Sequence, residues 1–124
     1  MARRRSPALT DAEAEVMAAL WHLQRASVAQ ITAVVNGTRA VTYSTVQTIL
    51  RILETKGYVK HDKVARAFVY TPVVDVGQAR RRALRHLVKR LFDGSLSLLV
   101  LNVLEDDELD PAERERLRTL IDRA

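Results

Sequence analysis

The sequence predicts a mainly α-helical fold with one small β hairpin. Three observations predict it: helix-start signals recur along the chain, apolar residues follow them at helical spacing, and a single segment is rich in β-formers. The chain has 124 residues, which is the length of about one domain or of a compact module with a helical appendage. Hydrophobic residues make up 48% of the chain, which is enough for a packed core.

Three helices are predicted in the N-terminal half, each beginning at a capping side chain. Thr10 and Ser27 begin capping boxes, because Glu13 and Gln30 follow at the third position. Thr42 can cap the third helix. A glycine follows the second and the third helix, where a left-handed residue commonly ends a helix. The predicted bounds are residues 11–23, 28–36 and 43–56, and the third helix has an apolar stripe of Val46, Ile49, Leu50 and Leu53.

A β hairpin is predicted directly after the third helix. Residues 58–61 and 67–71 are rich in β-formers, and Pro72 ends the second strand. The linker between them, residues 62–66, is polar and basic and predicts a charged tip. Three helices followed by such a hairpin make a winged helix-turn-helix, here residues 8–72, in which the turn at residues 37–41 is slightly longer than the tightest of its class.

Three further helices, over residues 75–123, predict a C-terminal dimerisation arm. Their predicted bounds are 75–92, 95–104 and 110–123, and the second is apolar almost all round. A helix of this kind is expected to be buried on several sides. A two-fold dimer can bury it, because the same apolar patch of each subunit then covers that of the other. The alternative is that this segment folds back on the winged domain. The residues expected in the interface are Leu84, Leu87, Leu91, Leu98, Leu99, Leu101, Leu117 and Leu120.

The charge of the chain is unevenly distributed. The net charge is +5 and the sequence pI is about 10.1, which is typical of nucleic-acid binders. Residues 76–92 carry six basic and no acidic side chains, whereas residues 93–124 carry four basic and nine acidic ones. We expect these carboxylates to face the arginines of residues 80–90, within or between subunits.

Composition excludes several other classes of protein. The absence of cysteine excludes disulfides, thiolate metal sites and a cysteine nucleophile. No apolar run is long enough for a membrane span, and no apolar stretch follows the basic N-terminus as in a signal peptide, so we expect a cytoplasmic protein without direct membrane binding.

Enzymatic, metal and cofactor sites are not expected. The three histidines, His22, His61 and His86, lie on separate elements without metal-ligand spacing. The sequence has no nucleophile elbow and no P-loop.

The third helix carries the candidate DNA-reading residues, because the second helix of a helix-turn-helix enters the major groove. Gln47 can bond adenine N6 and N7, and Ser or Thr suits several base edges. The candidate base-reading residues are Tyr43, Ser44, Thr45, Gln47 and Thr48. The candidate phosphate contacts are Arg39, Arg51, Lys63 and Arg66, and an arm of Arg3, Arg4 and Arg5 could also lie along DNA or simply be solvated.

Several segments together resemble the BlaI/MecI/CopY (penicillinase repressor) family. The resembling segments are Thr10–Met17 with Leu20-Trp21, Thr42–Leu53, Lys56–Val59, Phe68–Pro72 and Ser97–Glu105. The resemblance implies a homodimeric winged-helix transcriptional repressor that binds an inverted-repeat operator and controls antibiotic-resistance or stress genes. Family recognition positions match Ser44, Thr45 and Gln47, although the family often has lysine and arginine in place of Ser44 and Gln47.

The resemblance also implies a mode of regulation. In the penicillinase branch a membrane-bound sensor protease triggers cleavage of an Asn–Phe bond, and this chain has Asn102-Val103 there. Alternatively, Asn102 makes a specific hydrogen bond in a helix interface. The cysteine motif of the copper-responsive branch is absent.

Two other functions remain open at this point. The same scaffold can serve as a protein-docking module without sequence-specific DNA binding, or as an activator or small-molecule sensor. A docking surface would need exposed apolar anchors on the third helix and wing, where the sequence instead has Ser, Thr, Gln, Lys and Arg.

Overall fold

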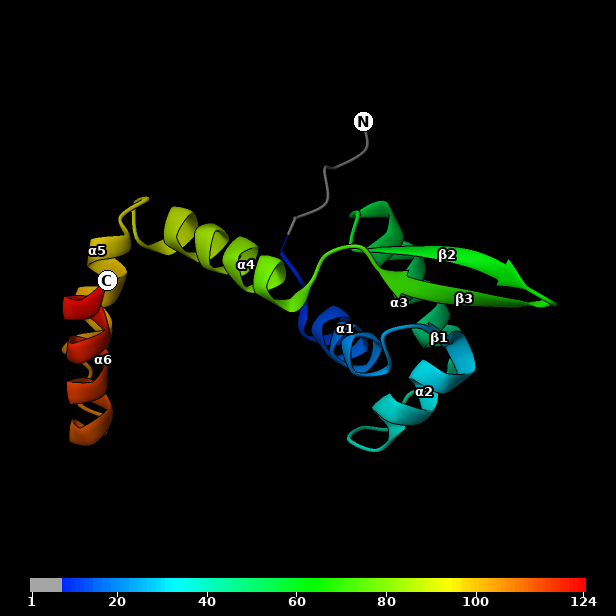
Figure 1. Ribbon diagram of the computed structural model, residues 1–124, viewed down its shortest axis with the longest axis horizontal. Helices are drawn as coiled ribbons and strands as arrows, with labels where there is room; N and C mark the ends of the chain where they lie inside the picture. The colour runs from blue at the N-terminus through cyan, green and yellow to red at the C-terminus, as the bar shows by residue number, and fades with distance from the viewer. Residues whose placement is uncertain (1–7) are drawn as a thin grey trace. The chain divides into compact units, whose positions relative to one another are not determined.

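The computed structural model describes residues 8–124, so the Arg3–Arg5 arm lies outside the described residues. Six α-helices and one three-stranded sheet make up this part of the chain (Figure 1), which confirms the predicted mainly α fold with a small β wing. The chain divides into two compact units, one up to Ala83 and one from Leu84 to Ala124.

The N-terminal unit contains the three helices and the sheet. Thr10 and Ser27 form the predicted capping boxes, and Thr42 accepts a hydrogen bond from the N–H of Thr45. The elements are α1 (Asp11–Leu23), β1 (Ala26–Ser27), α2 (Val28–Asn36), α3 (Tyr43–Thr55), β2 (Val59–Val64), β3 (Ala67–Pro72) and the first half of α4 (Val76–Leu91).

The sheet is antiparallel, with strand order β1-β3-β2. The hairpin register runs from the Val59–Pro72 pair to the Val64–Ala67 pair. The predicted linker over residues 62–66 is therefore wrong. Backbone pairing with β3 extends β2 to Val64 although Asp62 and Lys63 are polar, and only Ala65 and Arg66 form the turn, with Ala65 at a φ of 55°. The sequence analysis also missed β1, because two residues are too few to show an alternating pattern.

The hydrophobic core lies among α1, α2, α3 and the sheet. The predicted stripe of α3 is buried along its whole length, and Val46, Leu50 and Leu53 are fully enclosed. Each such side chain contributes about 1.5–3 kcal/mol on burial. Trp21 adds a directed contact, because its indole N–H donates to the Val74 carbonyl at 2.9 Å.

A buried ion pair joins the start of α1 to the end of α3. Lys56 Nζ donates to Glu13 Oε1 at 2.7 Å and to the Ala8 carbonyl at 3.0 Å, and both charged side chains are less than a tenth exposed. The same carboxylate oxygen accepts the N–H of Thr10 in the capping box. Burial raises the pKa of Glu13, but the hydrogen bonds from Lys56 and Thr10 and the charge of Lys56 lower that pKa by more, so it falls below its ordinary value of 4.5.

The C-terminal unit contains the second half of α4, α5 (Leu96–Leu104) and α6 (Pro111–Arg123). Asp93 and Gly94 adopt positive φ values of 52° and 75° between α4 and α5, a conformation that ends the helix. Arg114 caps α5, because its guanidinium donates to the carbonyls of Leu104 and Asp106.

The acidic side chains of this unit do not pair with α4 within one described chain. The ion pair present here joins Glu113 to Arg116 within α6, and none of the ion pairs of residues 8–124 involves an arginine of α4. Across the same described range, no helix has the length and apolar character needed to cross a membrane.

The substitution Glu13→Gln tests the buried pair. Gln preserves the capping geometry but leaves the Lys56 ammonium buried without a counter-charge, so unfolding free energy is expected to fall by about 3 kcal/mol. Urea titration monitored by Trp21 fluorescence measures this. Glu15→Gln, which affects an exposed pair with Arg39, is the matched control and is expected to cost less than about 1 kcal/mol.

The same variant has an expected acid profile. Because the folded-state pKa of Glu13 is depressed, its stabilising contribution is complete above the unfolded pKa and is lost as the pH falls through the lower folded value. Stability of the parent should therefore fall more steeply than that of Glu13→Gln below about pH 4.5. Equal slopes for the two proteins would contradict this role of Glu13.

Candidate nucleic-acid interface

The turn between α2 and α3 is braced by Asn36. Its Oδ1 accepts the N–H of Val41 at 3.0 Å, while its Nδ2 donates to the carbonyls of Val41 and Thr32. One side chain thus bonds both backbone groups of Val41, which lies one residue before the cap of α3. From the sequence, Asn36 was only the last residue of the helix predicted over residues 28–36. The preference of Asn for side-chain-to-backbone bonds in turns is the signal that could have found this brace.

The N-terminal half of α3 presents its polar side chains away from the core. Tyr43 is 51% exposed, Ser44, Thr45 and Thr48 are exposed, and Gln47 is half-buried. This arrangement follows from the buried stripe on the opposite side of the helix. The five candidate base-reading residues therefore lie together along the first turns of α3.

Hydroxyl groups in this set have partners within their own helix. Thr45 Oγ1 accepts a hydrogen bond from the Thr42 hydroxyl at 2.9 Å, and the Thr48 hydroxyl donates to the Ser44 carbonyl at 3.0 Å. These bonds restrict the rotamers of Thr45 and Thr48. Each hydroxyl oxygen still has acceptor capacity for a further partner.

The four candidate phosphate-binding side chains have different surroundings. Arg39 donates from Nε to Glu15 Oε2 at 2.9 Å, so its charge is already partnered by α1. Arg51 is exposed on α3, and Lys63 and Arg66 lie at the wing tip, which we define as residues 63–66. Within residues 8–124, Arg51, Lys63 and Arg66 take part in no ion pair.

The wing contacts the C-terminal half of α3 through a histidine. His61 Nδ1 lies 2.5 Å from Glu54 Oε1, and the His61 ring lies 4.9 Å from that of Phe68 and 5.4 Å from that of Tyr70. Burial raises the pKa of Tyr70, and the nearby Glu54 carboxylate raises it further. From the sequence, His61 is considered only as a candidate metal ligand and is excluded as one, and no local pattern links it to position 54.

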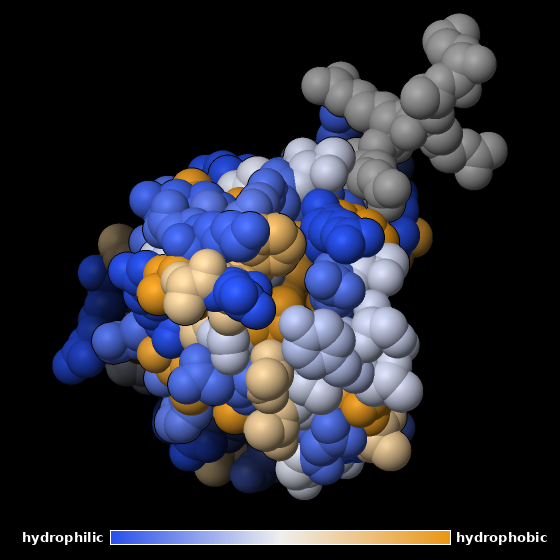
Figure 2. All heavy atoms as spheres, turned by 90° about the vertical axis from the view of Figure 1, so that its right-hand side faces the viewer, coloured by the Kyte–Doolittle hydropathy of each residue, from blue (hydrophilic) through white to orange (hydrophobic). Residues whose placement is uncertain are grey.

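The surface around the wing is mainly hydrophilic. Figure 2 views the protein from the end toward which the hairpin points in Figure 1, and its apolar areas are small and interspersed with polar ones. Some apolar side chains on these elements are nevertheless exposed, including Val64 and Phe68.

The predicted dimerisation residues of the C-terminal unit are all exposed or half-buried. No residue of α5 or α6 is buried. Leu84, Leu91, Leu98, Leu101 and Leu120 are between 36% and 63% exposed, and Leu87, Leu99 and Leu117 are half-buried.

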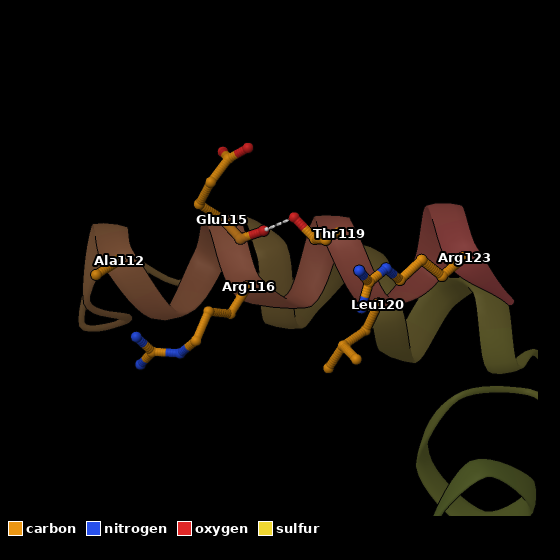
Figure 3. Close-up of a pocket in the computed structure, with 6 residues that line it drawn as sticks. All are labelled: Ala112, Glu115, Arg116, Thr119, Leu120 and Arg123. Carbon is orange, nitrogen blue, oxygen red and sulfur yellow. Dashed lines mark hydrogen bonds between the residues drawn. The ribbon is translucent and has the colours of Figure 1, made fainter.

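One face of α6 also lines a shallow hollow of about 550 Å³. Arg116 and Leu120 project from the same side of this helix, while Glu115 projects from the opposite side (Figure 3).

Asn102 and Val103 lie inside α5, with exposed side chains. The Asn102 amide donates to the Leu98 carbonyl at 2.8 Å, within its own helix.

A helix-turn-helix with a polar recognition face, followed by a basic-tipped hairpin, defines a winged-helix DNA-binding protein. The residues described contain no group of three or more His, Cys, Asp or Glu that could hold a metal ion.

Comparison with known proteins identifies the family. The penicillinase repressor family model matches residues 9–123. The penicillinase repressor of Bacillus licheniformis is 31% identical over 119 residues, covering 96% of this chain and 93% of that protein. The methicillin resistance regulatory protein MecI of Mammaliicoccus sciuri is 26% identical, covering 93% of this chain and 94% of that protein. The chain belongs to the penicillinase repressor family, a family of transcriptional repressors and not of enzymes.

Solved structures agree with this assignment. The solution structure of the DNA-binding domain of the repressor BlaI matches with a TM-score of 0.53 and 33% identity, over 61% of this chain and 93% of that one. The monomeric form of Bacillus licheniformis BlaI in complex with the blaP half-operator matches with a TM-score of 0.50, the same identity and the same coverage.

Replacing Asn36 tests the brace of the turn. Asn36→Ala removes the side-chain bonds to Val41 and Thr32, and we expect it to lower the unfolding free energy by about 1 kcal/mol. Thr38→Ala lies in the same turn and is the control. It is expected to change the unfolding free energy by no more than about 0.5 kcal/mol. Chemical denaturation of both variants gives the comparison, and equal stabilities would show that Asn36 does not brace the turn.

Proposed function

We propose that this protein is a transcriptional repressor that binds an inverted-repeat operator as a homodimer. The observation that carries the proposal is the polar face on the first turns of α3, within a winged helix-turn-helix whose family consists of repressors. A relative of the same fold was solved on a half-operator, which supports the same use of this surface.

In this proposal α3 enters the major groove and reads bases. Gln47 bonds adenine, and Tyr43, Ser44, Thr45 and Thr48 contact base edges or nearby phosphates. Arg39, Arg51, Lys63 and Arg66 bind phosphate, which sets the register of the protein on the duplex but carries no sequence information.

The C-terminal unit pairs two copies in this proposal. Its apolar side chains are too exposed for an isolated chain, and large exposed apolar surfaces commonly mark interfaces. A second copy of the same unit would cover both surfaces with one two-fold contact. Two recognition helices could then occupy major grooves about 34–36 Å apart.

The names of the relatives indicate which kind of genes such repressors regulate. They are repressors or regulators of penicillinase and methicillin resistance. We propose that this chain likewise controls antibiotic-resistance or stress genes by occupying their promoters.

Binding to DNA immediately upstream of its own gene tests the function, with a random duplex of equal length as control. At least about 10³-fold tighter binding of the upstream fragment, with two chains bound, is expected. Weak and equal binding to both duplexes would contradict specific repression from that site. No binding at low salt would contradict DNA binding altogether and favour the protein-docking alternative.

Base reading by Gln47 has its own test. Gln47→Ala is expected to weaken binding to the upstream fragment by about 1–3 kcal/mol, because it loses a bidentate contact to a base. Titration of the random duplex with the same variant is the control and should show little change. An equal loss on both duplexes would reject base reading by Gln47.

Dimerisation through α5 is tested by Leu101→Glu. A carboxylate in the proposed apolar interface would have to be desolvated, so the dimer present at micromolar concentration is expected to become mostly monomer. Sedimentation equilibrium measures this change. Val73→Glu adds the same charge at an exposed apolar position outside the arm and should leave the dimer intact; a monomeric parent would contradict the proposed interface.

A further inference from the structure

The wing has few side-chain attachments to the helices behind it. In β2 only Val59 is buried, and the other five residues of the strand are exposed. The hairpin projects beyond the helices of its unit (Figure 1). Within residues 8–124, the side-chain contacts of β2 with the rest of the unit include the hydrogen bond between His61 and Glu54 and a longer Arg25–Asp62 ion pair of 4.0 Å.

The His61–Glu54 contact lies at an opening rather than in a packed interface. An open hollow of about 460 Å³ lies beside this contact, between the exposed part of the hairpin and the C-terminal half of α3, and its lining consists of Arg51, Glu54, Thr55, His61, Phe68 and Tyr70. Where a hollow replaces packing atoms, van der Waals contact does little to define the angle between the elements. Val59 and Tyr70 anchor the base of the hairpin in the core, and the directed bond between His61 and Glu54 restrains the exposed part of the hairpin beyond them.

The His61 ring is itself held in place by β3. Tyr70 is the cross-strand partner of His61, and the Phe68 ring lies within 5 Å of the His61 ring. Tyr70 is 2% exposed and belongs to the core, so the imidazole rests on a fixed base. Its Nδ1 is thereby directed at the Glu54 carboxylate.

The His61–Glu54 contact lies close enough to the wing tip to influence where its basic side chains are placed. Lys63 follows His61 by two residues along β2, about 7 Å at strand spacing. A change of angle at His61 is therefore carried to Lys63 and Arg66. On α3, Glu54 follows Arg51 by three residues, so the same bond links the wing to the part of α3 that presents a candidate phosphate contact.

We propose that His61 and Glu54 are positioning residues that hold the wing at the angle at which Lys63 and Arg66 bind DNA phosphate. This inference rests on the proposed function, since it assigns the wing a phosphate contact. The pair itself touches no DNA. The wing tip therefore contributes to DNA affinity only while the bond between His61 of β2 and Glu54 of α3 is intact.

The experiment compares wing-tip neutralisation in three backgrounds. Lys63→Ala/Arg66→Ala is introduced into the parent, into His61→Phe, and into Glu54→Ala. Phe preserves an aromatic ring against Phe68 and Tyr70 but removes Nδ1. The probe is a random-sequence duplex at several salt concentrations, because phosphate contacts dominate non-specific binding and no operator is needed.

In the parent, wing-tip neutralisation is expected to weaken binding about tenfold and to reduce the salt slope by about two contacts. In His61→Phe and in Glu54→Ala, the same neutralisation should weaken binding less than about threefold, because the wing tip no longer reaches phosphate. Thr55→Ala lies next to Glu54 and lines the same hollow, but its hydroxyl bonds only its own helix at Arg51. In that control background the full tenfold effect should remain.

A measurement without DNA completes the test. Backbone ¹⁵N order parameters over residues 60–68 are expected to fall in His61→Phe and Glu54→Ala and to stay unchanged in Thr55→Ala. Unchanged order parameters in all variants would overturn the inference.

The outcomes with DNA separate the two claims. An undiminished wing-tip effect in His61→Phe and Glu54→Ala would overturn the positioning role and leave DNA binding intact. No effect of neutralisation even in the parent would overturn the phosphate role of the wing and the inference with it. Absence of any duplex binding by the parent would refute the proposed function itself.

Discussion

The burial of one stripe of α3 is the constraint on which the N-terminal unit depends. Val46, Ile49, Leu50 and Leu53 take the whole inward side of that helix, so its other side must face solvent. The core could use any apolar residues of suitable volume, but the helix cannot rotate without exposing them. The face that packing leaves free carries the five candidate base-reading residues, and the stability of the fold and the orientation of this surface therefore have the same cause.

Polar contacts connect the two ends of α3 to the rest of the unit. At its start, Asn36 bonds the backbone of Val41 and defines how the chain enters α3. At its end, Lys56 reaches the buried carboxylate of Glu13, and Glu54 reaches the wing. A buried ion pair adds little net stability compared with an apolar pair, but its loss leaves an uncompensated charge, so it specifies one arrangement of the helices.

The two units differ in how completely they bury their apolar residues. The N-terminal unit encloses a cluster that includes Met17, Leu20 and Ile31, whereas no residue of α5 or α6 is fully buried. Because exposed apolar area is unfavourable in water, the C-terminal unit is the part of the molecule that would gain most free energy from the proposed partner. In the proposed dimer, the apolar residues predicted from the sequence would cover one another; their place in an interface stays a prediction.

Local chemistry determined the elements and their order. Capping boxes at Thr10 and Ser27, the cap at Thr42 and the apolar stripe of α3 act within a few residues, so the sequence alone predicted these helices and the exposed candidates on α3. Only the tertiary structure decided that Glu13 pairs with Lys56 and that His61 pairs with Glu54. The Lys56–Glu13 contact joins positions 43 residues apart, and β1 exists only because β3 lies beside it. Long-range pairing depends on which surfaces the packed core brings together, and no local pattern in the chain encodes that proximity.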